Sequence, residues 1–225
     1  MSLSDYDPII ERYGPPTDAQ IVSQAEAERY RGRLPDGLLA FWTTYGRGWW
    51  HPPGKFALCD PAVFEPVLET AFRGDPEFRA EDFVVWAHNS FGDLNLSDRS
   101  DDNVTLDPQF MLFAKDAFLN FRTKDHAFAR AMLYTIEAAK PWSDEDGTDM
   151  HPPALAKLGP LAPGEIYGHV PAIALGGDNE FDNLQKVRAR EYLGLLVQSQ
   201  PLELFDYGFD SPTGSRTVRS IGPQG

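Results

Sequence analysis

The chain has 225 residues and a formal net charge of −14 at pH 7, with 34 Asp and Glu against 20 Lys and Arg. This negative total repels the phosphates of nucleic acids and of anionic lipids, so direct binding to either is not expected, whereas a basic protein would be attracted. A purely solubilising role of the charge is the alternative. Hydrophobic residues make up 42% and charged residues 24%, as in folded globular proteins, so general disorder is not expected.

Cysteine content and hydropathy exclude further classes of protein. Cys59 is the only cysteine, so an intramolecular disulfide, a Cys-rich zinc site and a CxxC redox motif are impossible. The sequence has no run of 18 apolar residues that would cross a bilayer, and its first residues lack the basic and apolar segments of a signal peptide. We therefore expect the protein in the cytoplasm and without a membrane partner.

The first two predicted helices have recognisable ends. Leu3–Tyr13 stops at Gly14, which two prolines follow. Ser23 and Glu26 have the spacing of a capping box, in which each side chain bonds to the backbone N–H of the other residue. A second helix is therefore expected to run from Ser23 to about residue 33.

Two further helices have an apolar face. Pro35 begins the first, and Gly46 ends it. Asp60 and Pro61 are an N-cap followed by proline at the first helical position, so the second begins there. Apolar residues at helical spacing are predicted to face the core: Leu38, Phe41, Trp42 and Tyr45 in the first helix, and Val63, Phe64, Val67, Leu68 and Ala71 in the second.

Between these two helices, residues 48–54 are rich in Gly and Pro, which predicts irregular structure. This segment contains Trp49 and Trp50 side by side, and we expect at least one of them to be partly exposed. Tryptophan is strongly enriched at the energetic centres of protein interfaces, so both are candidates for partner binding. The alternative is that both rings fill the edge of the core.

The rest of the chain predicts strands interleaved with helices and turns. Residues 83–87 and 91–96 are expected to pair across a turn, and 97–103 to form a second turn. Further strands are predicted at 55–59, 104–106, 109–114, 166–175 and 202–207, and further helices at 124–139 and 183–198. Because a strict strand–helix–strand rhythm is missing, the prediction is an α+β fold with a mixed, mostly antiparallel sheet flanked by helices.

Composition suggests how the chain is divided. Residues 141–153 are acidic and poor in apolar residues, and two prolines end the stretch, which is typical of a boundary. We expect an N-terminal region at 1–140, with a C-terminal region at 150–207 packed on it in one compact unit. The remaining residues, 208–225, are rich in Gly, Ser and Pro and are expected to be a loose tail.

The motifs of several enzyme classes are absent. The sequence contains no phosphate-binding loop, no GxGxxG, no GxSxG elbow and no HExxH. Ala174–Asp178 follows a predicted strand as a phosphate cradle would, but it lacks Lys and Ser/Thr, so a tight turn is favoured. A catalytic pair of Cys59 with a histidine stays open as an alternative. The histidines are scattered, at His51, His88, His126, His151 and His169.

Two clusters of acidic residues, within 98–107 and 144–149, would steer a cationic partner toward the protein. Asp98, Asp101 and Asp102 would also suit a divalent ion, but the residue order of an EF-hand loop and its central Gly are missing. A solvated turn is therefore favoured over a metal site, and neither a metal nor another cofactor is predicted.

Several segments resemble a known family. Leu34–Gly46, followed by a strand and Asp60–Pro61, resembles the GAD-like domain family, and so does the aromatic strand that leads into Phe91–Leu94. Tyr167–Gly177 and the helix predicted after it are similar to the C-terminal region that accompanies this domain in type VI secretion immunity proteins, of the kind that protects bacteria against a DNase toxin. The resemblance spans about residues 5–205.

This resemblance implies stoichiometric inhibition of a cognate toxin, with no catalytic residue. A nuclease toxin carries basic residues that hold DNA phosphates, and an acidic protein would occupy or distort that surface. The chain departs from the family pattern at Arg47 and in the residues after it, which affects the identity of the toxin. The candidates for partner binding are Trp49, Trp50, Asp98, Asp101, Asp102, Asp144, Glu145 and Asp146. Residues with an expected structural role are Phe91, Gly92, Asp93, Leu94, Gly176 and Gly177.

Two other hypotheses stay open. The first is a small hydrolase or nucleotide-handling enzyme, which would have a cleft between the two regions and a His or carboxylate of shifted pKa in that cleft. The second is an interaction module of a regulatory assembly that involves no toxin.

Overall fold

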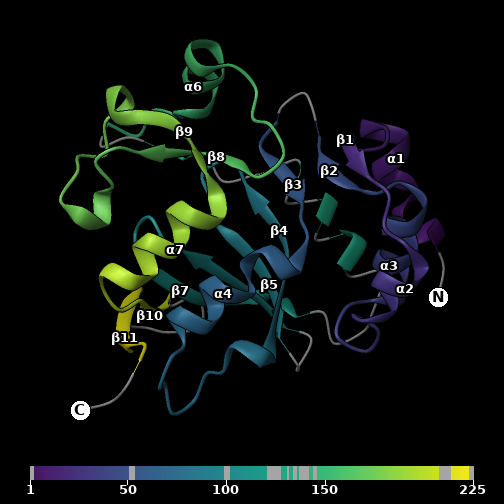
Figure 1. Cartoon of the computed structure of the whole chain (residues 1–225), viewed down its shortest axis with the longest axis horizontal. Helices are drawn as coiled ribbons and strands as arrows, with labels where there is room; N and C mark the ends of the chain where they lie inside the picture. The colour runs from purple at the N-terminus through teal and green to yellow at the C-terminus, as the bar shows by residue number, and fades with distance from the viewer. Residues whose placement is uncertain are drawn as a thin grey trace.

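The computed structural model describes residues 3–50, 54–98, 102–120, 128–130, 132, 133, 136, 142, 143, 146–207 and 214–222, and only the backbone of residues 102, 103 and 115–120. Within these residues the chain forms one large sheet, one two-stranded sheet and helices on both faces of the large sheet (Figure 1). The predicted α+β class with a mixed, mostly antiparallel sheet is confirmed.

The large sheet has the strand order β1-β2-β3-β4-β5-β6-β7-β10-β11. Neighbouring strands are antiparallel except β7 and β10, which are parallel. The two remaining strands, β8 and β9, pair with each other. The bounds are β1 Thr17–Gln20, β2 Arg47–Trp49, β3 Phe56–Leu58, β4 Phe83–Asn89, β5 Leu94–Asp98, β6 Asp102–Asp107, β7 Leu112–Asn120, β8 Glu165–His169, β9 Leu184–Arg188, β10 Glu203–Asp206 and β11 Arg216–Ser220.

Helices of different lengths connect these strands. The α-helices are α1 Asp7–Tyr13, α2 Gln24–Glu28, α3 Asp36–Thr44, α4 Pro61–Ala71, α6 His151–Leu158 and α7 Ala189–Ser199. Short 3-10 helices are η1 Leu3–Tyr6, η2 Ala80–Asp82, η3 Ile173–Leu175 and η4 Phe181–Asn183. The described residues of the helix predicted at 124–139 are helical, and Phe128, Met132 and Ile136 are buried there.

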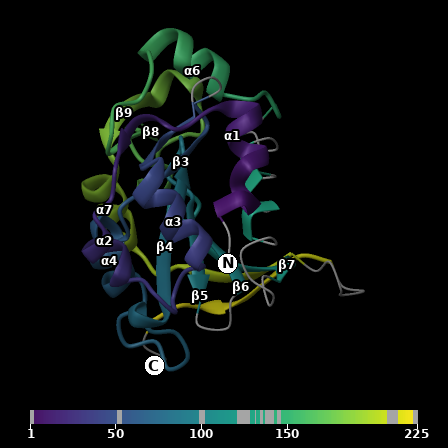
Figure 2. The ribbon, with the colours of Figure 1, turned by 90° about the vertical axis from the view of Figure 1, so that its right-hand side faces the viewer.

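The large sheet is covered on both faces because alternate residues of its central strands point in opposite directions. Val85 of β4 joins the core under α4 and α7, whereas Val84 and Trp86 join the core formed with α1, α2 and α3. Figure 2 shows α4 and α7 on one side of β4–β6 and α1 on the other. A third cluster, which includes Trp49, Ala154 of α6 and Tyr167 of β8, connects the end of the sheet to the two-stranded sheet.

At α2 and α4 the predicted N-caps are confirmed. The Ser23 hydroxyl accepts a hydrogen bond from the backbone N–H of Glu26 at 3.2 Å, and the Asp60 carboxylate accepts one from that of Ala62 at 3.1 Å. The helix that begins after Ser23 ends at Glu28, earlier than residue 33, because the chain then turns toward α3.

Two predictions of local structure are wrong. The segment predicted to be irregular contains β2 at its start, because Gly48 allows β1 to approach: a Cβ there would lie 2.5 Å from the carbonyl oxygen of Thr17. The helix predicted at 183–198 begins only at Ala189, since the residues before it pair with β8 as strand β9. Strand ends also differ from the prediction: β5 reaches Asp98, β6 begins at Asp102, β7 begins at Leu112 and β8 ends at His169.

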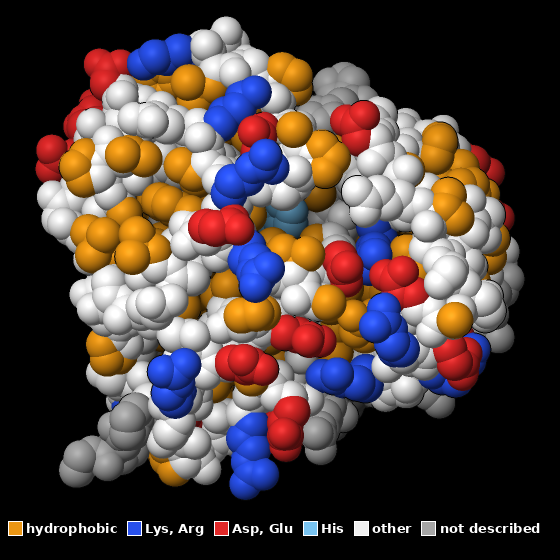
Figure 3. All heavy atoms as spheres, viewed as in Figure 1, with side chains coloured by type: hydrophobic (Ala, Val, Ile, Leu, Met, Phe, Trp, Pro, Cys, Tyr) orange, Lys and Arg blue, Asp and Glu red, His pale blue; other side chains and the backbone are white. Residues whose placement is uncertain are grey.

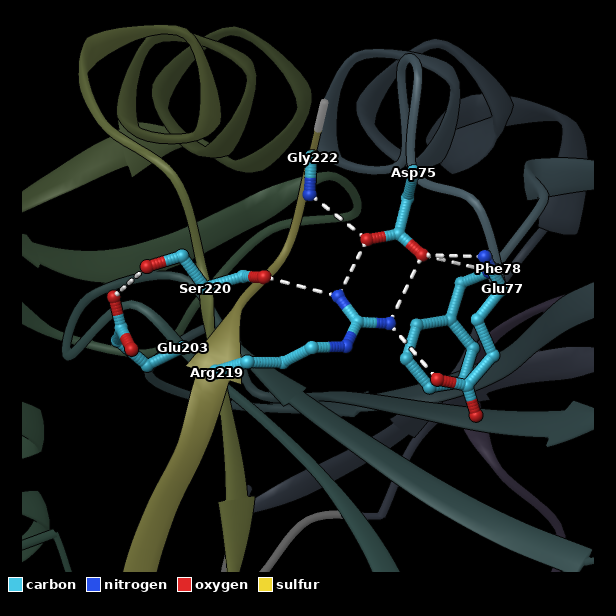
Figure 4. Close-up of polar contacts among 7 residues, drawn as sticks. All are labelled: Asp75, Glu77, Phe78, Glu203, Arg219, Ser220 and Gly222. Carbon is cyan, nitrogen blue, oxygen red and sulfur yellow. Dashed lines mark hydrogen bonds and ion pairs between the residues drawn. The ribbon is translucent and has the colours of Figure 1, made fainter. Parts of the chain in front are cut away.

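The predicted loose tail contains an ordered strand. β11 pairs with β10, and Arg219 of β11 holds the carboxylate of Asp75 with two hydrogen bonds of 2.7 and 3.1 Å (Figure 4). The backbone N–H of Gly222 donates to the same carboxylate at 2.9 Å. This part of the tail prediction is therefore wrong, because a buried acid before β4 fixes the strand. The division of the chain at 141–153 stays a prediction.

Candidate functional site

Trp49 and Trp50 are both buried, with exposed fractions of 2% and 1%, so the expectation that one is partly exposed is wrong. The Trp50 ring lies between those of Phe41 and Phe56, and its indole N–H donates to the carbonyl of Gly14 at 3.2 Å. Helix α3 and strand β3 thus supply aromatic partners that remove this ring from the surface. Trp49 is also buried, but it lines a cavity beside the start of α4.

The acidic candidates are placed differently from one another. Asp98 ends β5, is 7% exposed and lines a cavity. Asp146 is exposed, and of Asp102 only the backbone in β6 is described. Asp101, Asp144 and Glu145 lie outside the described residues.

The Phe91–Leu94 motif forms the turn between β4 and β5. The side-chain oxygen of Asn89 accepts hydrogen bonds from the backbone N–H groups of Phe91 and Asp93 at 2.9 and 3.0 Å. Gly92 has a φ of 88°, and a Cβ on it would lie 2.7 Å from Cδ1 of Ile166, so a side chain is excluded twice. The last motif residue, Leu94, is fully buried in the core under α4. These contacts are those of a structural turn that β8 covers.

The second glycine motif also has a structural role. Gly176 ends η3 in the left-handed conformation, with a φ of 86°. Gly177 lies against the chain itself, because a Cβ on it would be 2.1 Å from the carbonyl oxygen of Pro171. The residues between β8 and β9 therefore form a compact turn without a phosphate-binding Lys.

Sequence reasoning missed Gln109, which joins the two parts of the chain. Its side chain is 1% exposed, and its amide donates to the carbonyls of Phe91 and Tyr167. Its Oε1 lies 3.0 Å from Nδ1 of His169, so that nitrogen carries the proton. Burial lowers the pKa of His169 to about 4 and keeps the ring neutral. No local motif marks Gln109, because the partners of its side chain are distant in sequence: Phe91, two residues of β8, and Tyr192 of α7, whose hydroxyl lies 3.4 Å from Oε1.

A cavity of about 250 Å³ lies where β1–β3 meet the start of α4 and the loop before β8; we call it the seam cavity. Figure 3 shows a hollow near the middle of this face with histidine atoms at its floor and charged side chains of both signs around it. The seam cavity is lined by Asp18, Gln20, Arg47, Gly48, Trp49, Ala57, Leu58, Cys59, Asp60, Val63, Phe64, His88, Pro163 and Gly164.

Arg47, at one wall of the seam cavity, has its charge compensated. It is 7% exposed and donates to the carboxylates of Glu26 at 2.7 Å and Asp60 at 3.2 Å. Its guanidinium carbon lies 5.1 Å from the ring centroid of Trp42, within the range of a cation–π contact. Arg47 therefore contacts both acids and the Trp42 ring within the fold. The residue at which the chain departs from the family pattern thus has structural contacts.

His88, another lining residue of the seam cavity, is a neutral histidine with an unused acceptor. It is 4% exposed, and its ring lies edge-on to Trp49 and Phe64, with centroid distances of 5.1 and 5.7 Å. Its Nδ1 lies 2.9 Å from the carbonyl oxygen of Asn89, so Nδ1 is the donor and Nε2 is left as an acceptor. Burial lowers the pKa of His88 and favours this neutral form. Within the described part of the chain Nε2 forms no hydrogen bond.

Cys59, which also lines the seam cavity, is not placed as a nucleophile. Its Sγ lies 3.9 Å from the carbonyl oxygen of Val85, and burial raises the pKa of the thiol far above its ordinary value. A thiol that is held protonated does not react as a thiolate. The described residues therefore offer no support for the alternative of a Cys59–His pair.

Two further cavities, of about 570 and 310 Å³, share Arg33 and Glu81 as lining residues; we call them together the acidic groove. Arg33 spans the two cavities and donates to the backbone carbonyls of Glu81 and Phe83, each at 2.9 Å. Among the described lining residues the one other cation is Arg79, whose side chain lies 3.9 Å from that of Glu81. In the part of the lining that the structure describes, acids outnumber bases; the acids are Glu65, Glu69, Glu81, Asp82 and Asp98.

Neither a metal site nor a membrane span emerges from the residues that the structure describes. No group of three or more His, Cys, Asp or Glu side chains within that part of the chain is arranged to hold a metal ion. No described helix combines the length and the apolar composition that crossing a bilayer requires.

Comparisons with known proteins match this architecture. Residues 4–107 match the family model of the GAD-like domain, and residues 131–199 match the model described as "T6SS immunity protein Tdi1, C-terminal". The chain is also similar to a solved structure titled "Crystal structure of Atu4351 from Agrobacterium tumefaciens", with 24% identity and a TM-score of 0.86 over 96% of this chain and 98% of that chain, a likeness that shows the fold. No protein of curated function matches the chain.

The two family matches coincide with the parts that meet at the seam cavity. Pro163 and Gly164 of its lining lie within the second match, and the other lining residues lie within the first. The N-terminal part of the chain, residues 4–107, is thus matched by the GAD-like domain family, and residues 131–199 are matched by the C-terminal family of the type VI secretion immunity protein Tdi1.

Proposed function

We infer that this protein binds and neutralises a cognate toxin of a type VI secretion system by forming a stoichiometric complex. The observation that supports this most is the match of residues 131–199 to an immunity family, next to a GAD-like domain. Inhibition by binding requires a complementary surface and no catalytic group, which fits the absence of the enzyme motifs from the sequence.

We further propose that the toxin is a nuclease and that the encounter occurs in the cytoplasm. A protein that cleaves nucleic acid carries a basic surface for phosphates, and a chain with a net charge of −14 is attracted to it. The acidic groove supplies a local excess of carboxylates, since its described lining residues include more Asp and Glu than Arg. Asp98, one of the candidates from the sequence, lies in its wall.

The enzyme hypothesis keeps one specific observation in its favour. The seam cavity lies between the two family regions, where that hypothesis expects a cleft, and the pKa of His88 is lowered there by burial. Loss of a measured turnover in a His88→Gln variant that still folds would support an enzyme. The buried, protonated thiol of Cys59 gives that histidine no nucleophile to activate.

The proposed function is tested by expressing the neighbouring gene of the secretion locus in a bacterial cytoplasm, with and without this chain. We expect killing and chromosomal DNA degradation by the neighbour alone, survival on co-expression, and a complex of fixed stoichiometry on gel filtration. Sending the toxin to the periplasm instead tests the compartment. A neighbour that kills without degrading DNA, but is still bound and neutralised, would remove only the nuclease assignment. A neighbour that is neither toxic nor bound would contradict immunity and favour an interaction module.

A further inference from the structure

We propose, resting on the immunity function above, that the seam cavity is the anchor site for one basic side chain, Lys or Arg, of the toxin. The size of the cavity limits the occupant. Its volume of about 250 Å³ lies below the roughly 300 to 1,000 Å³ of sites that enclose a small-molecule ligand. A single long side chain suits such a space, and protein interfaces concentrate their binding energy in side chains that enter a desolvated pocket.

The chemistry of the walls selects a donor. Nε2 of His88 is an acceptor that has no hydrogen-bond partner among the described residues. The His88 side chain is buried, with an exposed fraction of 4%. An ammonium or guanidinium group has only donors to offer, so it complements this nitrogen. An anionic side chain would meet an acceptor instead and would leave both groups without a hydrogen bond.

The charge balance of the cavity also favours a cation. The guanidinium of Arg47 is shared by Glu26 and Asp60, so those three side chains already include more negative than positive charge. Asp18, on the outer strand β1, adds a further carboxylate that forms no ion pair with any described residue. The aromatic residues Trp49 and Phe64 also line the cavity. Aromatic rings attract cations through cation–π interactions.

The backbone of the cavity wall has a second unusual feature. Asp18 has a φ of 52°, in the left-handed region that residues other than glycine seldom adopt. Its neighbourhood is constrained by the close approach of Thr17 to Gly48, which leaves no space for a Cβ. Asp tolerates this region better than most residues, so the conformation suits the side chain that is present. Here it places an exposed carboxylate at the cavity.

The position of the seam cavity connects it to the acidic groove. The start of helix α4 contributes Asp60, Val63 and Phe64 to the cavity, and the same helix contributes Glu65 and Glu69 to the groove. Helix α4 lies at the front of the face shown in Figures 1 and 3. A basic toxin surface on this face would be attracted by the groove and would insert one side chain into the cavity. Because the cavity needs both family regions, it offers a toxin-specific pocket that neither region has alone.

A pair of tryptophan variants on α4 tests the proposal. Val63 is half-buried and lines the cavity, whereas the adjacent Ala62 is exposed and does not. We expect the Trp side chain of Val63→Trp to fill the cavity. The dissociation constant for the purified toxin encoded by the neighbouring gene should then rise by about 30-fold or more, as it does when an anchor residue is lost. Ala62→Trp should stay within about 3-fold. Equal affinities of the two variants would overturn the proposal, provided that the wild type binds.

A charge variant gives an independent answer without changing the packing. Asp18→Asn keeps a side chain that tolerates a positive φ and removes only the charge. We expect it to weaken toxin binding by about 5-fold or more, chiefly through faster dissociation, with Asp178→Asn as the control on an exposed acid outside the cavity. No difference between these two variants would contradict a cationic occupant. If the wild-type chain binds no toxin at all, the proposed function itself has failed, which separates the two outcomes.

Discussion

Arg219 and Asp75 lie 144 positions apart in the sequence and form a two-pronged ion pair, with N–O distances of 2.7 and 3.1 Å (Figure 4). The Asp75 side chain is fully buried, and it also accepts hydrogen bonds from the backbone N–H groups of Glu77, Phe78 and Gly222. Burial alone raises the pKa of Asp75, but the bonds from Arg219 and from these N–H groups outweigh burial and hold the pKa well below its ordinary value.

This ion pair predicts that Arg219→Met destabilises the protein by about 2 to 4 kcal/mol, because it leaves a buried carboxylate without its countercharge. Arg216→Met on the same strand is the matched control: its side chain is mostly exposed and lies 3.8 Å from that of Asp206, so a loss below about 1 kcal/mol is expected. Urea denaturation of both variants measures the difference. Equal losses would mean that β11 is not held by Asp75.

Gly92 and Gly176 separate the effect of backbone conformation from that of packing. Their φ angles are 88° and 86°, but a Cβ on Gly92 would lie 2.7 Å from Ile166, whereas one on Gly176 would meet no atom within 4 Å. Gly176→Ala should cost about 1 kcal/mol for the positive φ. Gly92→Ala should cost about 1 to 3 kcal/mol more, because the buried side chains of Ile166 and Leu193 must shift to make room. Thermal unfolding of both variants tests this, and equal costs would show that the contact with Ile166 adapts freely.

Features encoded by neighbouring residues were predictable from the sequence, and those that depend on distant partners were not. The cap residues Ser23 and Asp60 act on backbone groups two or three positions away, so the local pattern places the helix starts. Strand β9 is different, because Leu184–Arg188 becomes a strand through its pairing with β8 rather than through its own periodicity.

The candidate site shows the same limit. The composition around Trp49 and Trp50 favours exposed aromatic rings, but partners from α3, β3 and β4 bury both. The seam cavity arises where segments from two regions meet, and the unused Nε2 of His88 follows from the hydrogen bond of Nδ1 to Asn89. Neither property has a local sequence signal. Among the acidic candidates, Asp98 lines the groove together with acids of α4 and η2 that no motif singles out.

The acidic groove predicts the kinetics of toxin binding. Reversal of Glu65, Glu69 and Glu81 to Lys should slow association with a basic toxin by about 10-fold or more at low salt, while dissociation changes less. Reversal of three exposed acids outside the groove, Glu11, Asp178 and Glu180, changes the net charge equally and serves as the control. Surface plasmon resonance at several salt concentrations distinguishes the two sets. Equal slowing would assign the attraction to total charge and not to the groove.

His169 predicts how stability depends on pH. Its pKa is lowered by burial to about 4 in the folded protein, whereas an exposed histidine has a pKa of about 6.5, so the unfolded chain binds the proton first as the pH falls. The free energy of unfolding should therefore decrease as the pH falls from about 6.5 toward 4, with a contribution of this residue on the order of 2 kcal/mol at pH 5. The lowered pKa of His88 acts in the same direction, whereas Asp75, with its depressed pKa, contributes only below about pH 4.

The variant His169→Asn isolates this contribution. Its amide offers a donor to Oε1 of Gln109 but does not titrate, so the variant should be less stable than the wild type at pH 7.5 and should lose less stability between pH 7.5 and pH 5. Chemical denaturation at both pH values gives the two differences. If the free energy of unfolding falls by the same amount in the variant and in the wild type, the pH dependence arises from other groups and not from protonation of His169.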